Sequence, residues 1–257
     1  MENVVIERVK TGIPGLDELL EGGIPKGSVV LLSGSAGSGK TIFGLQFIIK
    51  GAELYNERGA FITFEQNKKD IVEQALLFGW DVEKLEEEGK IKIISLGRDD
   101  VFSLKEKIVE LKENFSVKRI VIDSLTFYYT YAMIYIYTKE YIKSGESLVK
   151  DEILKHSKDL VIRSTILELV SKLKELDITS LLISEVYDTA QQLSKDGVSE
   201  FIVDGVILLN YVSIASEMFG NIEIRKMRKT GHKQGLYPLY IEKNGLRIGE
   251  EEISVIK

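Results

Sequence analysis

Short apolar runs alternate with helix-like segments over most of the chain. Runs of apolar and β-branched side chains typical of buried strands occur at residues 29–32, 61–64, 91–96, 119–125 and 180–186. Segments with apolar side chains at helical spacing lie between them, at residues 41–56, 68–78, 101–115 and 159–176. Because strands that alternate with helices form parallel sheets covered by helices, the pattern predicts an α/β protein.

The pattern changes after residue 204, where strand follows strand. The strand-like segments are 206–211, 222–229 and 237–248, and the last contains an Asn244-Gly245 turn signal. These segments predict an antiparallel extension of the sheet. The sequence shows no internal repeat and no change of composition, so residues 1–257 are predicted to form a single domain.

One connection is much longer than the few residues that usually join a strand to a helix. We interpret residues 127–158 as an inserted segment. Its first part, residues 126–138, is uncharged and rich in tyrosine. Tyr129, Tyr131, Tyr135 and Tyr137 would share one face of a strand, whereas Tyr128, Tyr131 and Tyr135 would share one face of a helix. Periodicity does not decide between the two.

Composition excludes several classes of site and partner. The chain has no Cys and two His, which excludes disulfides and thiolate sites and argues against a His-based metal site. The net charge of -6 argues against a surface coated for nucleic acid, although a local basic patch could still bind phosphates. The amino terminus is acidic and no apolar run reaches the ~20 residues of a membrane span, so we expect a cytoplasmic protein.

A glycine-rich segment follows the first buried strand. Residues 34–41 read Gly-Ser-Ala-Gly-Ser-Gly-Lys-Thr, the pattern of a phosphate-binding P-loop, and placement between a strand and a helix argues against a chance turn. Backbone N–H groups of such a loop bind phosphates, Lys40 would reach the β- and γ-phosphates, and Thr41 would bind Mg²⁺. The sequence therefore predicts ATP and Mg²⁺ bound by Gly34, Ser35, Ala36, Gly37, Ser38, Gly39, Lys40, Thr41 and Ile42.

Three carboxylates follow predicted strands. Asp123 ends the apolar run Ile-Val-Ile-Asp, the Walker B arrangement, and is predicted to hold Mg²⁺ with Thr41. Glu65 is the best candidate to orient or deprotonate the attacking water. Glu185 could sense the γ-phosphate through water or could simply cap its strand. Ligands bind beyond the carboxyl ends of parallel strands, so all three are expected to lie together.

The chain resembles the KaiC-like ATPases of the RecA superfamily over nearly its whole length. The resemblance rests on the order and spacing of several segments. These are Thr-Gly-Ile-Pro-Gly-Leu-Asp at 11–17, Gly-Gly-Ile-Pro-Lys-Gly at 22–27, Asp-Ser-Leu-Thr at 123–126, Glu-Phe-Ile-Val-Asp at 200–204, Lys-Met-Arg at 226–228 with His232, and Gly235 followed by Tyr237-Pro238.

The resemblance implies a RecA-like fold and a ring-forming ATPase, usually a hexamer, with ATP held between subunits. It further implies that Lys226 and Arg228 reach the γ-phosphate of the adjacent subunit, with His232 beside the same nucleotide. From the residues alone, five Lys or Arg within 225–233 would instead suggest a solvated edge strand.

Departures from the family limit what the resemblance carries over. KaiC proteins have paired glutamates after the second strand, whereas this chain has Glu65 and Gln66, so hydrolysis is expected to be slow or altered. The position of the Ser-Thr autophosphorylation pair falls near Glu200 and Phe201, and there is one ATPase unit rather than two. A phosphorylating clock protein is therefore not expected.

Three functions remain open. The first is a ring-forming ATPase that regulates or remodels an unidentified protein partner. The second is a RadA-like ATPase that binds single-stranded DNA through the tyrosines with Lys139 and Lys143 nearby, although RadA proteins end the sensor strand in Asn-Gln where this chain has Ser184-Glu185. The third is a nucleotide-gated scaffold with little hydrolysis, suggested by Gln66.

Overall fold

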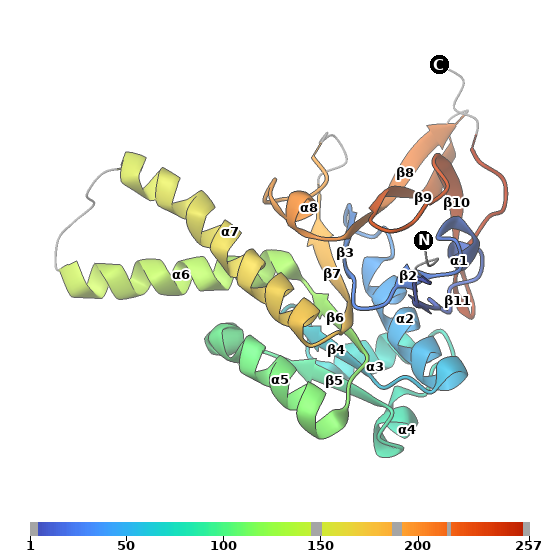
Figure 1. The fold of residues 1–257 in the computed structure, drawn as a ribbon, viewed down its shortest axis with the longest axis horizontal. Coiled ribbons are helices and arrows are strands. Elements are labelled where there is room, and N and C mark those ends of the chain that lie inside the picture. Colours follow the sequence, from blue (N-terminus) through green and yellow to red (C-terminus); the bar gives the residue numbers. More distant parts are fainter. Residues whose placement is uncertain (1–4, 145–150, 187–191, 215–216, 254–257) are drawn as a thin grey trace.

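The computed structural model describes residues 5–144, 151–186, 192–214 and 217–253. A nine-stranded sheet in the order β11-β10-β9-β8-β3-β7-β6-β4-β5 forms its centre (Figure 1). Strands β8, β3, β7, β6, β4 and β5 are parallel, and β9, β10 and β11 continue the sheet antiparallel. The predicted fold class, a mostly parallel sheet with an antiparallel carboxyl-terminal extension, is confirmed.

The strands of the large sheet are β3 (Val29–Gly34), β4 (Gly59–Thr63), β5 (Ile91–Ser95), β6 (Arg119–Asp123), β7 (Thr179–Glu185), β8 (Gly205–Ile214), β9 (Glu217–Met227), β10 (Leu236–Glu242) and β11 (Gly245–Ile248). The short strands β1 (Arg8–Val9) and β2 (Ile24–Pro25) pair with each other. The helices are α1 (Leu16–Leu19), α2 (Lys40–Tyr55), α3 (Lys68–Leu76), α4 (Val82–Glu87), α5 (Leu104–Phe115), α6 (Leu125–Ser144), α7 (Asp151–Glu175) and α8 (Ser199–Ile202), with a 3₁₀ turn at Arg98–Ser103.

Alternate residues of the buried strands supply two separate cores. Leu32, Phe61 and Val121 face the core that is covered by α2, α3 and α4. Leu31 and Ile122, which point the other way, belong to the core covered by α5, α6 and α7. Because both faces are covered, the central strands are apolar at nearly every position, which explains their continuous apolar runs in the sequence.

The tyrosine-rich segment is helical, and the expected helix start at residue 159 was wrong. Helix α6 runs unbroken from Leu125 to Ser144, and α7 already begins at Asp151. The two helices extend together beyond the sheet (Figure 1). Their bases belong to the core, where Tyr128, Tyr129 and Ile162 are buried. Periodicity could not decide the conformation of this segment because an uncharged aromatic run satisfies both strand and helix spacing.

The carboxyl-terminal half of α2 packs on a buried arginine that is paired with a partly exposed glutamate. Arg119 of β6 is fully buried, and its Nε donates to Glu57 Oε2 at 2.6 Å. Its guanidinium carbon lies 4.7 Å from the ring centre of Phe47 and 5.4 Å from that of Tyr55. Gly51 of α2 leaves the space that this side chain occupies, because a Cβ there would lie 2.5 Å from Arg119 Nε.

We expect Gly51→Ala to destabilise the protein by about 1–3 kcal/mol, because the added methyl group displaces a buried, paired guanidinium. Gly97→Ala is the control, since a Cβ at Gly97 would come no closer than 3.5 Å to another residue's atoms, at Asp100 Oδ2. Denaturant unfolding of both variants measures the difference. Equal midpoints for the two variants would contradict the packing argument.

Candidate nucleotide site

The glycine-rich loop leads from β3 directly into α2. Gly39, which precedes the helix, has a φ of 92°, a conformation that glycine adopts without strain. Gly34 ends β3 so close to β8 that a Cβ there would lie 2.4 Å from Leu209 O. Lys40 is the first helical residue, and its Nζ donates to Ser35 O at 2.6 Å. The sequence therefore places the ammonium group over the loop, at the positive end of a helix of sixteen residues.

The hydroxyls of this loop fit an anionic ligand. Ser35 and Ser38 are buried, and within the described part of the chain their Oγ atoms have no hydrogen-bond partner. Buried hydroxyls are normally paired, so two unpaired ones in one loop indicate a site that a bound group completes. Phosphate oxygens would accept hydrogen bonds from them and from the loop N–H groups.

Thr41 and Asp123 meet at the carboxyl end of the sheet. Thr41 Oγ1 donates to Asp123 Oδ2 at 2.8 Å. Burial raises the pKa of the Asp123 carboxyl to about 7, against the lowering effect of the Thr41 hydrogen bond. The nearby charges of Glu65 and Glu185 raise this pKa further, and Lys40 lowers it. A buried carboxylate beside a hydroxyl and an ammonium group is suited to a divalent cation and phosphate.

The other two strand-end carboxylates lie in the same place. The sheet register pairs Thr63 with Asp123 and Gly34 with Glu185, so Glu65 follows a strand that adjoins Asp123. Thr63 Oγ1 accepts hydrogen bonds from the N–H groups of Glu65 and Gln66, which fixes the turn. Glu65 is exposed, whereas the Gln66 amide oxygen is buried without a partner among the described residues.

Glu185 forms an ion pair with a lysine. Its Oε2 lies 3.4 Å from Lys195 Nζ, and its N–H donates to Thr126 Oγ1 at 3.5 Å. The carboxylate is half-buried at the end of β7. Glu185 therefore lies near Asp123, but its ion pair is with Lys195, which belongs to another loop.

Lys226 and Arg228, which are predicted to reach a neighbouring subunit, lie at the opposite end of the strands from the glycine-rich loop. Lys226 pairs with Val206 of β8, which pairs with Leu31 of β3. The glycine-rich loop starts after Gly34, three residues further along β3, which is roughly 10 Å at the usual rise of a strand. Arg228 lies one residue beyond the end of β9. Neither side chain is brought to the loop of its own chain.

These two cations are bound locally. Lys226 Nζ donates to Glu200 O at 2.9 Å and to Val203 O at 2.6 Å, which satisfies carbonyls at the end of α8. Burial and the charge of Arg228 lower the pKa of Lys226. Lys226 and Arg228 line a recess of about 830 Å³, together with Arg225 and Phe201. His232 follows in the next loop, half-buried, and its Nε2 has no partner among the described residues.

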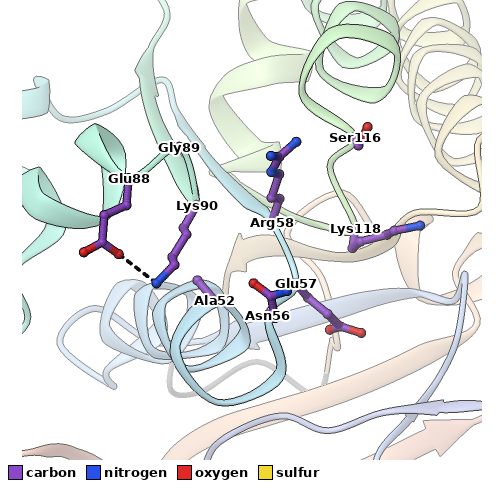
Figure 2. Close-up of a pocket in the computed structure, with 9 residues that line it drawn as sticks. All are labelled: Ala52, Asn56, Glu57, Arg58, Glu88, Gly89, Lys90, Ser116 and Lys118. Atoms are coloured by element: carbon purple, nitrogen blue, oxygen red, sulfur yellow. Dashed lines mark ion pairs between the residues drawn. The ribbon is translucent and has the colours of Figure 1, made fainter.

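A second recess lies at the same end of the strands, before β4, β5 and β6 (Figure 2). It encloses about 370 Å³, and on one side of it Lys90 Nζ lies 2.7 Å from Glu88 Oε2. Glu57, also on its wall, is bound to Arg119. Charged side chains that are already paired do not favour a nucleotide, and the glycine-rich loop is at the other end.

Comparisons with known proteins agree with this geometry. Residues 9–136 and 139–253 match the family described as "ATPase: KaiC". The chain belongs to the KaiC ATPase family. The circadian clock oscillator protein KaiC of Nostoc sp. is 31% identical over 253 residues, which are 95% of this chain and 44% of that protein. KaiC of Synechococcus elongatus is 31% identical over 257 residues, which are 96% of this chain and 45% of that protein.

A solved structure resembles the whole chain. The KaiC-like protein of the hyperthermophilic archaeon Pyrococcus horikoshii has a TM-score of 0.79 and 37% identity, and the match covers 95% of this chain and 99% of that one. The curated KaiC relatives are longer, since the chain spans less than half of their length. The chain is an ATP-binding ATPase domain with the RecA-like fold.

Two contacts of this KaiC-like domain were missed by sequence reasoning. Tyr211 of β8 donates from its hydroxyl to Gly37 O at 3.0 Å and so holds the phosphate loop. Asp204, just before β8, binds three separate segments of the chain. Neither residue lies in the glycine-rich loop or at a strand-end position, so only the long-range register of β8 reveals them.

The RadA alternative is not favoured. The comparisons point to KaiC, and Tyr128 and Tyr129 are buried in the core rather than available to stack on bases. Tyr135 is exposed, but its ring centre lies 4.4 Å from that of Phe102. The side chains of Tyr137, Lys139 and Lys143 lie outside the described residues. Within the described chain no helix is long and apolar enough to cross a membrane.

Proposed function

We propose that copies of this chain assemble into a closed ring, a hexamer, and hydrolyse ATP at the interfaces between them. The nucleotide state of the ring then regulates a protein partner. The observation that supports the shared site is the position of Lys226 and Arg228. They lie at the opposite end of the strands from the glycine-rich loop, so they can contact a nucleotide only on another copy. Repeated head-to-tail contacts of this kind form a ring when the rotation between successive copies closes on itself.

Each half of the site has a separate task. On one copy, the glycine-rich loop and Lys40 bind the phosphates, and Glu65 orients the attacking water. Mg²⁺, when bound by Thr41 and Asp123, supplies positive charge to the phosphate oxygens. On the adjacent copy, Lys226 and Arg228 stabilise the negative charge that develops during phosphoryl transfer, and His232 contacts the same nucleotide.

Gln66 affects the rate rather than the binding of ATP. Its amide is uncharged where a second carboxylate would strengthen the pull on the water proton. We infer slow turnover, with one carboxylate, Glu65, acting alone. No cluster of three acidic or histidine side chains that could hold a metal exists among the described residues, so Mg²⁺ would depend on the nucleotide for further ligands.

The shared site predicts complementation between two inactive variants. We expect Arg228→Ala and Glu65→Gln each to reduce turnover by on the order of a hundredfold or more, because each removes one half of the site. When the two are mixed and reassembled, about a quarter of the interfaces join an intact Glu65 to an intact Arg228, since both orders of subunits occur at random. Turnover should rise to a comparable fraction of the wild-type rate.

Steady-state ATPase assays on the mixture, with light scattering to follow assembly in ATP, measure this. Lys107→Ala is the control, because that side chain pairs with Glu110 on the surface of its own helix at 2.8 Å. It should stay within about twofold of wild type, as surface pairs contribute little. A mixture no more active than its components would overturn the shared site.

A further inference from the structure

Asp204 joins three segments that are distant in the sequence. Its Oδ1 accepts from Lys174 Nζ at 2.8 Å and from Arg228 Nη1 at 3.3 Å. Its Oδ2 accepts from Val29 N at 3.1 Å. The backbone contributes two more bonds, from Asp204 N to Val29 O at 2.8 Å and from Arg228 N to Asp204 O at 2.9 Å. Asp204 is thus fixed to the first residue of β3, and it binds Arg228 twice, through its carboxylate and through its backbone carbonyl.

Lys174 already compensates the burial of this carboxylate. The Asp204 side chain is 10% exposed, so its charge requires a partner. Burial alone would raise the pKa of Asp204, but the hydrogen bonds from Lys174 and Val29, the charge of Lys174 and the hydrogen bond from Arg228 together lower it. Arg228 makes the smallest of these contributions, so most of the stabilisation of the buried carboxylate comes from Lys174 and Val29.

Arg228 gains orientation from the same contact. Half of its side chain is exposed, and a long exposed arginine samples many rotamers. Binding of Nη1 to Asp204 restricts the guanidinium, while its exposed side faces the recess that Lys226 also lines. Since Asp204 is bonded to β3, the guanidinium is held against the rigid sheet rather than on a free loop.

We propose that Asp204 is a positioning residue that orients Arg228 toward the nucleotide of the adjacent copy. The inference rests on the proposed function, because it assigns to Asp204 a share of the half-site that Arg228 supplies. A charged group that is fixed in position stabilises the transition state strongly, and a small displacement of that group lowers the rate substantially. Asp204 itself does not touch the nucleotide.

Asp204→Asn tests this assignment. The amide oxygen can still accept from Val29 N, but the charge that holds Arg228 is lost. We expect turnover to fall by on the order of ten- to a hundredfold, with ATP binding to the variant's own phosphate loop unchanged. Lys174→Met is the matched control, because it removes the other cation on the same oxygen and leaves Arg228 bound, so its turnover should stay within about twofold of wild type.

Subunit mixing separates positioning from a purely structural role. Asp204→Asn mixed with Glu65→Gln should regain turnover, because the Glu65→Gln copies supply an intact Arg228. Asp204→Asn mixed with Arg228→Ala should regain none, because neither supplies one. If Asp204→Asn does not fold, Asp204→Glu replaces it, since that variant keeps the charge but displaces it by one methylene group.

Each outcome is decisive. Wild-type turnover of Asp204→Asn, or recovery when it is mixed with Arg228→Ala, overturns the positioning role. So does failure to recover with Glu65→Gln under conditions in which Arg228→Ala does recover. If Arg228→Ala also fails to recover with Glu65→Gln, the shared site itself is wrong, and the positioning role is excluded with it.

Discussion

A Lys40→Ala variant is expected to lose ATP hydrolysis by on the order of a hundred- to a thousandfold, because one preorganised positive charge is removed from the phosphate site. Lys40 begins α2 and its Nζ lies 2.6 Å from Ser35 O, directly over the loop. Alanine is the best helix former, so the variant should keep its fold. Nucleotide-dependent assembly should be lost together with hydrolysis.

Lys50→Ala is the matched control for this prediction. Lys50 lies on the same helix, but its ammonium group pairs with Glu53 at 2.7 Å, one turn along the surface. Its loss should leave turnover within about twofold of wild type. ATPase rates and binding of a fluorescent nucleotide, compared at equal protein concentration, measure both variants. Wild-type turnover in Lys40→Ala would refute the assignment of the glycine-rich loop as the phosphate site.

The phosphate loop and the strands around it could be predicted because their determinants are local. An apolar run, a glycine-rich turn and a helical pattern are contiguous from Val29 to Tyr55. The carboxyl ends of parallel strands meet at one edge, so Asp123 could be placed beside Thr41 without a structure. The hydrogen bond between them confirms that placement.

The features that were missed depend on long-range contacts. The 126–138 segment has no charge to distinguish an inward from an outward face, and only packing against α7 and the sheet makes it a helix. The edge-strand interpretation, by contrast, fits residues 225–227, because β10 pairs with β9 at residues 221–223 and leaves 225–227 beside β8 alone. Asp204 binds Val29, Lys174 and Arg228, and no local pattern connects those positions.

Asp123→Asn is expected to have opposite effects on activity and on stability. Asparagine keeps the shape of the side chain and can still accept from Thr41, but it lacks the charge that Mg²⁺ requires. Turnover in Mg²⁺ should fall by on the order of a hundredfold. Without nucleotide and Mg²⁺, however, burial and the charges of Glu65 and Glu185 destabilise the carboxylate more than Thr41 and Lys40 stabilise it, so its removal should stabilise the protein.

The sign of the pH dependence follows from the raised pKa. Burial raises the pKa of Asp123 from 3.8 to about 7, so the folded protein binds this proton more tightly than the unfolded chain does. Stability therefore falls as pH rises from about 4 to 7 and stays lower above 7. The amide that replaces the carboxyl has no proton to lose, so Asp123→Asn should unfold at a higher temperature than wild type at pH 8. The difference should shrink toward pH 4.

Thermal unfolding in a chelator, at pH 8 and near pH 4, measures this difference. Asp99→Asn, a change at an exposed aspartate of the 98–103 turn, is the control and should follow the wild-type curve. A lower midpoint for Asp123→Asn at pH 8 would show that the carboxylate contributes more through Thr41 than its burial costs. If Asp123→Asn is more stable but turns over more slowly, the carboxylate serves to bind Mg²⁺ and does not stabilise the fold. Residues at functional sites commonly lower the stability of the protein in this way.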